Sequence, residues 1–246
     1  MSPSTMLNVH TVKLLRREEV AEGTMAFHFE KPAHFAFTPG QFVDLTLLHP
    51  PETDAEGDVR TFSVASAPHE ATLMLATRMR DTAFKRVLRS MPIGTEVQIE
   101  GPMGTLVLHD DPARPAVFLA GGIGITPFRS IVVDAITRHV PHRLFLFYSN
   151  RRPDDATFLD ELQALQRDHL RYTFVGTMTE PEKSSRPWTG ETGFITPAML
   201  SRHLVKGDAP IYYLVGPPGM VTGLHGALKD AGIHPRDIRV EAFTGY

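Results

Sequence analysis

The sequence predicts a two-domain protein, an antiparallel β-barrel followed by an α/β domain with a parallel sheet. Two observations support this prediction. Residues 7–108 read as short strands of alternating apolar and polar residues, separated by turn signals, which is typical of a small barrel. From Pro115 onward, continuous apolar segments alternate with amphipathic helical segments, which is typical of parallel strands joined by crossover helices.

In the first half, strand alternation is clearest over residues 41–47 and 95–99. One helix interrupts the strands, and its apolar residues fall three or four positions apart: Phe84, Val87, Leu88 and Met91. Thr82 can cap the start of this helix, and Pro92 and Gly94 predict its end.

In the second half, residues 116–120 are an unbroken apolar run, typical of a strand buried on both faces. The next helix carries one apolar stripe formed by Phe128, Ile131, Val132, Ala135 and Ile136. Further strands are expected at 143–149, 171–176, 211–215 and 238–242, and helices at 155–167, 197–204 and 218–231, the last ended by Gly232. The polar stretch 180–191 is expected to be a mobile loop.

The change of pattern falls in residues 109–115, where acidic residues and prolines suit a surface connection. We therefore predict a first domain over residues 1–110 and a second over residues 111–246. With 246 residues, 42% of them hydrophobic, the chain can bury a substantial core.

Charge and composition exclude several classes of function. The formal net charge of −3 provides no positive field for nucleic acid or an anionic membrane. The absence of cysteine excludes disulfides, thiolate zinc sites and a cysteine-ligated iron-sulfur cluster in this chain. The 12 histidines lack ligand spacing, so no metal site is predicted. Without a secretory signal or a run of ~20 apolar residues, a soluble cytoplasmic protein is expected.

The string Arg60-Thr61-Phe62-Ser63 suits a flavin. Strand alternation places Arg60 and Phe62 on one face, so a cation and a ring can contact the same ligand. A flavin offers a flat apolar face for the phenyl ring, anionic phosphates for the guanidinium and a hydrogen-bonding nitrogen, N5, for Ser63. The alternative is an ordinary strand with a surface arginine.

The helix that begins near Thr82 can present its free backbone N–H groups, together with the Thr82 hydroxyl, to a diphosphate. A plain helix cap is the alternative for this residue.

Two glycine-rich turns follow apolar strands in the second half. In Gly121-Gly122-Ile123-Gly124-Ile125-Thr126-Pro127, the glycines permit a tight turn and close approach of a pyrophosphate, with Thr126 as the expected N-cap and Pro127 as the first helical residue. The spacing differs from the G-x-G-x-x-G fingerprint of standard Rossmann dehydrogenases. The second turn, Gly216-Pro217-Pro218-Gly219-Met220, is expected at the same edge of the sheet.

On these three strings, the chain resembles the ferredoxin-NADP reductase family from about Val9 to Tyr246. The resemblance implies an FAD-binding barrel followed by a nicotinamide-nucleotide domain. It implies Arg60 at the flavin diphosphate, Phe62 against the ring and Ser63 at N5, with Thr61, Thr77 and Met79 as further flavin-binding positions. The family's flavin phosphate turn is degenerate here, Arg80-Asp81-Thr82-Ala83, and its role is assigned to Thr82 and Ala83.

The chain departs from the family at its third motif, where Val215-Gly216-Pro217 replaces the usual Cys-Gly-Pro, and Val215 is expected to provide an apolar wall. The C-terminal residues resemble relatives in which an aromatic ring covers the flavin, a role open to Phe243 or Tyr246. The resulting catalytic candidates are Ser63, Glu241 and Phe243.

The nucleotide preference stays open between NADH and NADPH. Ser149 at the end of a predicted strand, and Arg151 and Arg152 after it, place a hydroxyl and two guanidinium groups where an adenosine ribose would lie, and arginine favours a 2′-phosphate and hence NADPH. Asp154 and Asp155 suit a bare ribose diol.

The expected function is transfer of hydride from NADPH or NADH to FAD, and of electrons to a separate acceptor such as ferredoxin or an oxygenase component. Lys85, Arg86 and Arg89 form a candidate docking patch for a small acidic electron-transfer protein, or else a solvated helix face. Two other functions remain open: a reductase of free flavin or a ferric chelate, and a nucleotide-binding subunit without turnover.

Overall fold

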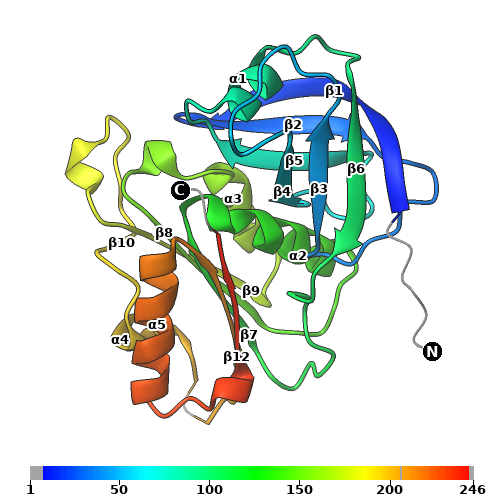
Figure 1. The fold of residues 1–246 in the computed structure, drawn as a ribbon. Coiled ribbons are helices and arrows are strands. Elements are labelled where there is room, and N and C mark those ends of the chain that lie inside the picture. The colour runs from blue at the N-terminus through cyan, green and yellow to red at the C-terminus, as the bar shows by residue number, and fades with distance from the viewer. Residues whose placement is uncertain (1–7, 206, 244–246) are drawn as a thin grey trace.

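Two six-stranded sheets form two domains in the computed structural model, which describes residues 8–205 and 207–243 (Figure 1). The first sheet is antiparallel, in the order β4-β3-β6-β1-β2-β5. Its strands are β1 (Asn8–Ala21), β2 (Thr24–Glu30), β3 (Phe42–Leu47), β4 (Val59–Ser63), β5 (Thr72–Arg78) and β6 (Glu96–Met103). A bridge between Val64, just after β4, and Leu75, in the middle of β5, joins the two outer strands, so the sheet closes into the predicted barrel.

Side-chain alternation builds the core of the barrel. On β3 every second residue is buried, namely Val43, Leu45 and Leu47, and Val97 and Ile99 of β6 pack into the same cluster. These residues point inward because successive side chains of a strand face opposite sides of the sheet. The strand alternation predicted for both segments is confirmed.

Helix α1 (Ala83–Ser90) follows the sequence prediction closely. The hydroxyl of Thr82 accepts a hydrogen bond from the backbone N–H of Lys85 at 3.3 Å, and Met91 is the C-cap that follows the last helical residue, Ser90. Its apolar side chains join the barrel core, so the helix packs against the barrel, at the top in Figure 1.

The second sheet is parallel, in the order β10-β9-β8-β7-β11-β12. Its strands are β7 (Ala116–Gly121), β8 (Leu144–Asn150), β9 (Tyr172–Met178), β10 (Glu191–Thr192), β11 (Ile211–Gly216) and β12 (Ile238–Ala242). Every residue of β7 and β11 is buried, because both strands lie inside the sheet and both faces are covered.

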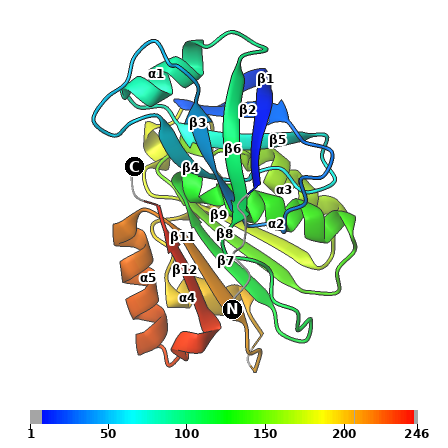
Figure 2. The same ribbon diagram turned by 45° about the vertical axis from the view of Figure 1, so that its right-hand side comes forward.

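Helices cover the two faces of this sheet (Figure 2). On the face toward the barrel, α2 (Thr126–Thr137) and α3 (Leu159–Asp168) pack on alternate strand residues such as Phe118 and Leu146. On the other face, α4 (Pro197–His203) and α5 (Pro218–Asp230) pack on residues such as Leu119 and Phe147. Both expected halves are confirmed: an antiparallel barrel followed by a parallel-sheet α/β domain.

Two helix starts differ from the prediction. Thr126 does not cap α2, because a 3-10 turn, η1 (Gly122–Ile125), connects β7 directly to the helix and Thr126 already has helical backbone angles. The helix expected from residue 155 begins only at Leu159, after η2 (Pro153–Asp155). Phe158, with a φ of 59°, lies in the left-handed region and separates the two segments.

The stretch 180–191 contains more structure than the expected mobile loop. It includes η3 (Pro181–Lys183), and β10 begins at Glu191 and pairs with β9. The indole N–H of Trp188 donates to the carbonyl of Glu191 at 2.7 Å, and a Cβ at Gly176 would lie 2.6 Å from the indole ring. The sequence suggested a loop because the stretch is polar. One residue, Trp188, orders it, and a single residue produces no periodic pattern in the sequence.

The sheets are connected by residues 104–115, since β6 ends at Met103 and β7 begins at Ala116. The predicted domain boundary at residue 110 lies within this connection and stays a prediction. The last 3-10 turn, η4 (Pro235–Asp237), leads into β12, which brings residues 241–243 to the junction of the two domains.

Candidate functional site

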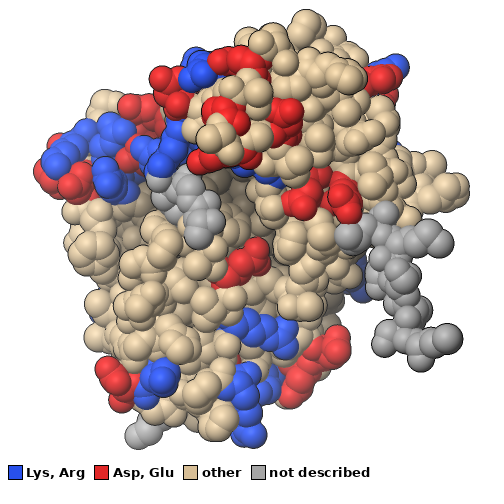
Figure 3. All heavy atoms as spheres, viewed as in Figure 1, with Lys and Arg blue, Asp and Glu red and all other residues tan. Residues whose placement is uncertain are grey.

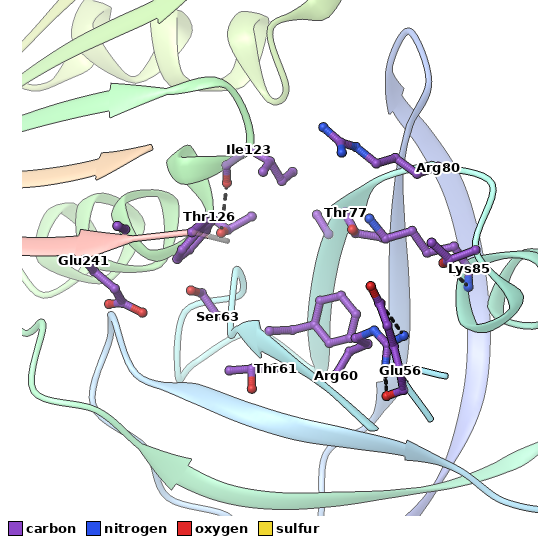
Figure 4. A pocket seen from close by; sticks show the side chains of 15 residues that line it. Glu56, Arg60, Thr61, Ser63, Thr77, Arg80, Lys85, Ile123, Thr126 and Glu241 are labelled. Carbon is purple, nitrogen blue, oxygen red and sulfur yellow. Dashed lines mark hydrogen bonds and ion pairs between the residues drawn. The ribbon is translucent and has the colours of Figure 1, made fainter. Parts of the chain in front are cut away.

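A cavity of about 740 Å³ lies where the barrel meets the second domain (Figure 4). The surface is hollowed at this junction (Figure 3). The barrel contributes β4, the end of β5 and α1, and the second domain contributes η1, the start of α2 and the end of β12. The lining residues are Glu56, Arg60, Thr61, Phe62, Ser63, Ala76, Thr77, Arg80, Thr82, Lys85, Ile123, Thr126, Glu241, Ala242 and Phe243.

Strand β4 brings a cation and a ring together, as predicted from alternation. The guanidinium of Arg60 lies 5.1 Å from the centre of the Phe84 ring, and the ring of Phe62 lies 6.0 Å from the same ring. All four residues of the string line the cavity, and the Thr61 hydroxyl donates to the Asp44 carboxylate of the neighbouring strand β3.

Ser63 ends β4 with a polar atom that needs a partner. Its side chain is buried, and its hydroxyl oxygen has no hydrogen-bond partner among the described residues. Because a buried hydroxyl without a partner is costly, such an atom in a cavity wall marks a place where a ligand completes the hydrogen bonding.

The end of β12 forms the opposite wall. Glu241 and Phe243 line the cavity, and Figure 4 shows Glu241 and Ser63 away from Arg80 and Lys85. Burial raises the pKa of the Glu241 carboxyl, which has no hydrogen-bond or ion-pair partner in the part of the chain that the structure describes. Tyr246, the other candidate for an aromatic cover, lies outside the described residues.

The other predicted flavin-binding residues of the barrel divide into two groups. Thr77 and Thr82 line the cavity, whereas Met79 packs against the barrel core and Ala83 is buried. The backbone N–H of Ala83, at the start of α1, donates to the carboxylate of Asp54 at 2.9 Å.

The two glycine-rich turns pack against each other. A Cβ at Gly124 would lie 2.5 Å from the carbonyl oxygen of Val215, and one at Gly121 would lie 2.3 Å from the sulfur of Met220. Gly124 leaves no room for a side chain because its neighbour is backbone, whereas a side chain at Gly121 would displace that of Met220, so the turn after β7 touches the turn after β11. The turns therefore meet at the carboxyl edge of the sheet, as predicted, near the cavity that Ile123 and Thr126 line.

Two expectations at these turns need correction. The hydroxyl of Thr126 donates to the carbonyl of Ile123 at 3.1 Å instead of capping the helix. Val215 is fully buried, and its side chain packs in the core beneath α2 and α3, so it provides no wall of the cavity. Within a parallel strand buried on both faces, this position points into the sheet's own core.

The family is decided by two matches to models of known domains. Residues 11–108 match the oxidoreductase FAD-binding domain, and residues 118–225 match the oxidoreductase NAD-binding domain. The chain belongs to the ferredoxin-NADP reductase-like flavoproteins. The barrel is thus the FAD-binding domain, and the α/β domain is the NAD-binding domain.

Curated relatives of this flavoprotein are longer than the chain. One subunit of the Na(+)-translocating NADH-quinone reductase of Yersinia enterocolitica is 29% identical over 206 residues, which cover 78% of this chain and 50% of the relative. The glycine betaine monooxygenase reductase subunit of Chromohalobacter salexigens is 27% identical over 239 residues, covering 96% of this chain and 64% of the relative. The chain spans about half to two thirds of the length of these relatives.

Solved structures share the fold of this flavoprotein. A ferredoxin NADP+ reductase from Neisseria gonorrhoeae, with bound FAD and NADP, superposes with a TM-score of 0.77 at 23% identity, covering 95% of this chain and 98% of that one. An Amycolatopsis cytochrome P450 reductase gives a TM-score of 0.80 at 24% identity, covering 98% of this chain and 72% of the other.

Two arginines follow β8, and only one of them, Arg152, forms ion pairs with described residues. Arg152 pairs with Asp155 at 2.8 Å and with Glu22 at 3.0 Å, so its charge is already compensated. Arg151 is exposed and has no side-chain partner among the described residues, and Ser149 beside it is half-buried. Of the two guanidinium groups, Arg151 is the one available to an anion.

The three residues of the predicted docking patch on α1 do not form one surface: Lys85, Arg86 and Arg89 lie in different surroundings. Lys85 lines the cavity instead of facing outward, and its amine donates to the carbonyl of Arg78 at 2.7 Å. Burial, together with the nearby Arg80 and Arg60, lowers the pKa of Lys85 to about 8. Arg86 pairs with Glu52 and Asp81, whereas Arg89 is exposed without a partner in the described part of the chain.

Sequence reasoning did not assign Glu56, Arg80 or Lys85 to the cavity, although Arg80 belongs to the predicted phosphate turn and Lys85 to the predicted docking patch. Glu56 lies in the connection between β3 and β4, which carries no strand or helix signal. Lys85 stands three residues after the Thr82 cap, and this spacing, one turn from the helix start, was a signal that it faces the same side as Thr82.

Two kinds of feature are absent from the described residues. In residues 8–205 and 207–243, no helix has the length and apolar character to cross a membrane. Over the same ranges, no group of three or more His, Cys, Asp or Glu side chains is arranged to hold a metal ion.

Proposed function

We propose that this chain takes hydride from NADH or NADPH on FAD and passes electrons to a separate acceptor such as a ferredoxin or an oxygenase component. The observation that carries the proposal is the Ser63 hydroxyl, buried without a partner among the described residues in a cavity that both domains line. An acceptor of this class is supported by the curated relative described as a monooxygenase reductase subunit.

The residues of the barrel side fit an FAD. Bound FAD would supply the two-electron chemistry that no side chain provides. Arg60 would bind the diphosphate, together with the Thr82 hydroxyl and the N–H of Ala83 at the start of α1. Phe62 would flank the flavin ring, and Thr61, Thr77 and Met79 would complete the surroundings of the cofactor.

Ser63 and Glu241 act at the reacting end. The Ser63 hydroxyl would hydrogen-bond the flavin nitrogen N5, which fixes the face that meets the nicotinamide. The burial that raises the pKa of Glu241 keeps its carboxyl protonated to higher pH, so it can hold a proton at the wall of the cavity. Phe243 would cover the flavin until the nicotinamide displaces it.

The second domain would bind the nicotinamide nucleotide at its two glycine turns. Gly121, Gly122 and Gly124, followed by Thr126 and Pro127, would receive the pyrophosphate, with Gly216 and Pro217 of the adjoining turn beside them at the same edge of the sheet. Ser149 and Arg151 would contact the adenosine ribose, and the free Arg151 favours NADPH.

The test begins with the purified protein under nitrogen, titrated with NADH and then NADPH while the flavin absorbance near ~450 nm is followed. We expect a yellow protein that each nucleotide bleaches with its own affinity. A colourless protein that binds nucleotide without turnover would identify a nucleotide-binding subunit. Turnover with a purified ferredoxin, against free flavin and a ferric chelate, then decides between a protein acceptor and a small one.

A further inference from the structure

The connection between β3 and β4 brings carboxylates to the groups proposed to bind the flavin diphosphate. We define the acidic loop as residues 50–58, which contain Glu52, Asp54, Glu56 and Asp58. Acidic side chains gather on the barrel beside basic ones, above the hollow between the domains (Figure 3). Within this loop, Asp54 and Glu56 carry the argument.

Asp54 lies at the start of α1, where the sequence predicts a phosphate. Its carboxylate accepts the N–H of Ala83 at 2.9 Å and that of Glu56 at 3.0 Å, and it lies 3.6 Å from the Arg60 guanidinium. The hydrogen bond from Ala83, followed by that from Glu56, lowers the pKa of Asp54, so this carboxyl is an anion at neutral pH. A negative charge therefore already occupies the positive end of the helix.

Arg60 is occupied by the same loop. Its guanidinium forms an ion pair with the Glu56 carboxylate at 2.7 Å, and it donates to the carbonyls of Glu56, Gly57 and Val59. Figure 4 shows Glu56 directly beside Arg60 in the cavity. While Arg60 keeps these partners, its terminal N–H groups are not free to donate to a diphosphate.

The acidic loop pairs with Arg60 but not with the other two cations that line the cavity, Arg80 and Lys85. Arg80 has no side-chain partner among the described residues, and Lys85 donates only to a backbone carbonyl there. The side chain of Glu56 is 69% exposed, so its ion pair is of the weak, solvent-screened kind that a stronger anion can replace.

We propose that the acidic loop is an internal ligand of the diphosphate-binding groups, which a flavin diphosphate displaces, so that Asp54 and Glu56 set the affinity of the cavity for flavin phosphates. This inference rests on the proposed function. The apparent dissociation constant equals the intrinsic one divided by the fraction of molecules that can bind the ligand. If the acidic loop holds Arg60 and the start of α1 in about nine molecules of ten, FAD binds about tenfold more weakly than it would without the loop.

The experiment measures binding of FAD and of riboflavin, which lacks phosphate, to the flavin-free protein by quenching of flavin fluorescence. The variants are Asp54→Asn, Glu56→Gln and the pair of both. The matched control is Asp58→Asn, because it removes the same charge from the same loop and the Asp58 side chain has no partner among the described residues.

We expect FAD to bind about tenfold more tightly to the double variant, with riboflavin affinity unchanged and the control close to wild type. Unchanged or weaker FAD binding in the double variant overturns the inference, as does an equal gain for riboflavin or for the Asp58 control. If the wild type binds FAD and accepts hydride while the variants show no gain, the loop inference alone fails. If no protein of the set binds FAD, the proposed function fails first.

Discussion

The guanidinium of Arg129, on α2 of the NAD-binding domain, pairs with the carboxylate of Glu70 in the FAD-binding domain at 2.9 Å. The same guanidinium pairs with Glu161 of α3 at 2.6 Å and donates to the carbonyl of Ala65 at 2.8 Å. The next residue, Ser130, donates to the carbonyl of Ser66 at 2.7 Å. These bonds fix how α2, the helix that follows the first glycine-rich turn, sits on the barrel.

We expect Arg129→Gln to lower the free energy of unfolding by about 2 kcal/mol, measured by urea denaturation. The loss is below the ~3–5 kcal/mol of a fully buried pair because the two carboxylates are 30% and 38% exposed. Hydride transfer should slow while FAD stays bound, since the domains lose their fixed orientation. Arg138→Gln, at the exposed C-cap of α2, is the control and should change stability by under ~0.5 kcal/mol. Equal losses in the two variants would contradict a role for Arg129 between the domains.

Ser63→Ala should slow reduction of the flavin by NAD(P)H about tenfold, the equivalent of one lost hydrogen bond, in a stopped-flow measurement. Stability should not fall, because the wild-type hydroxyl has no partner in the described part of the protein. Ser66→Ala is the matched control, since the hydroxyl oxygen of Ser66 is buried and accepts a hydrogen bond from the N–H of Met74 at 3.0 Å. That variant should lose ~1–3 kcal/mol of stability without a specific loss of hydride transfer. A loss of stability in Ser63→Ala, with unchanged hydride transfer, would assign Ser63 a structural role.

Glu241→Gln should remove a pH dependence of stability. The carboxyl titrates near 4.5 in the unfolded chain, and burial raises its pKa in the folded protein. Between these two values the folded protein holds the extra proton, so wild-type stability falls as pH rises through this interval. The glutamine variant should match the wild type at pH below 4.5 and exceed it at neutral pH, in urea unfolding without cofactor. A constant difference across the whole range would show that Glu241 does not titrate in this way.

Arg151→Gln should raise the KM for NADPH about tenfold and leave that for NADH unchanged, because the free guanidinium would lose its bond to the 2′-phosphate. Arg152→Gln is the control: its ion pairs with Asp155 and Glu22 leave it no free charge for a phosphate. If both variants affect NADH and NADPH equally, Arg151 does not select the nucleotide.

Arg89→Glu should slow reduction of an acidic ferredoxin severalfold at low salt, with little effect in high salt. Reduction of a small dye by the same variant should equal that of the wild type, because Arg89 does not line the cavity. Arg138→Glu, on the second domain, controls for the change in net charge. A loss that salt does not relieve, or one shared with the dye, would refute docking at this residue.

Local patterns were enough to predict much of this molecule. Alternation placed the core of β3, apolar spacing and the Thr82 cap bounded α1, and an unbroken apolar run identified β7. These features depend on neighbouring residues, whose periodicity is written directly in the chain. The motif Arg60–Ser63 also supplied one wall of the cavity, because a strand fixes which of its side chains share a face.

Only the tertiary structure decided what depends on distant segments. The turn of Lys85 into the cavity, the burial of Val215 in the sheet core, the pairing of Arg60 with Glu56 and the bridge from Arg129 to Glu70 each require knowing what packs on the element from elsewhere. A cation's spacing on its helix shows which side it faces, but the partner that neutralises it comes from another part of the chain. The sequence by itself determined the two domains and their motifs, and the fold determined which of those charges remain free for a ligand.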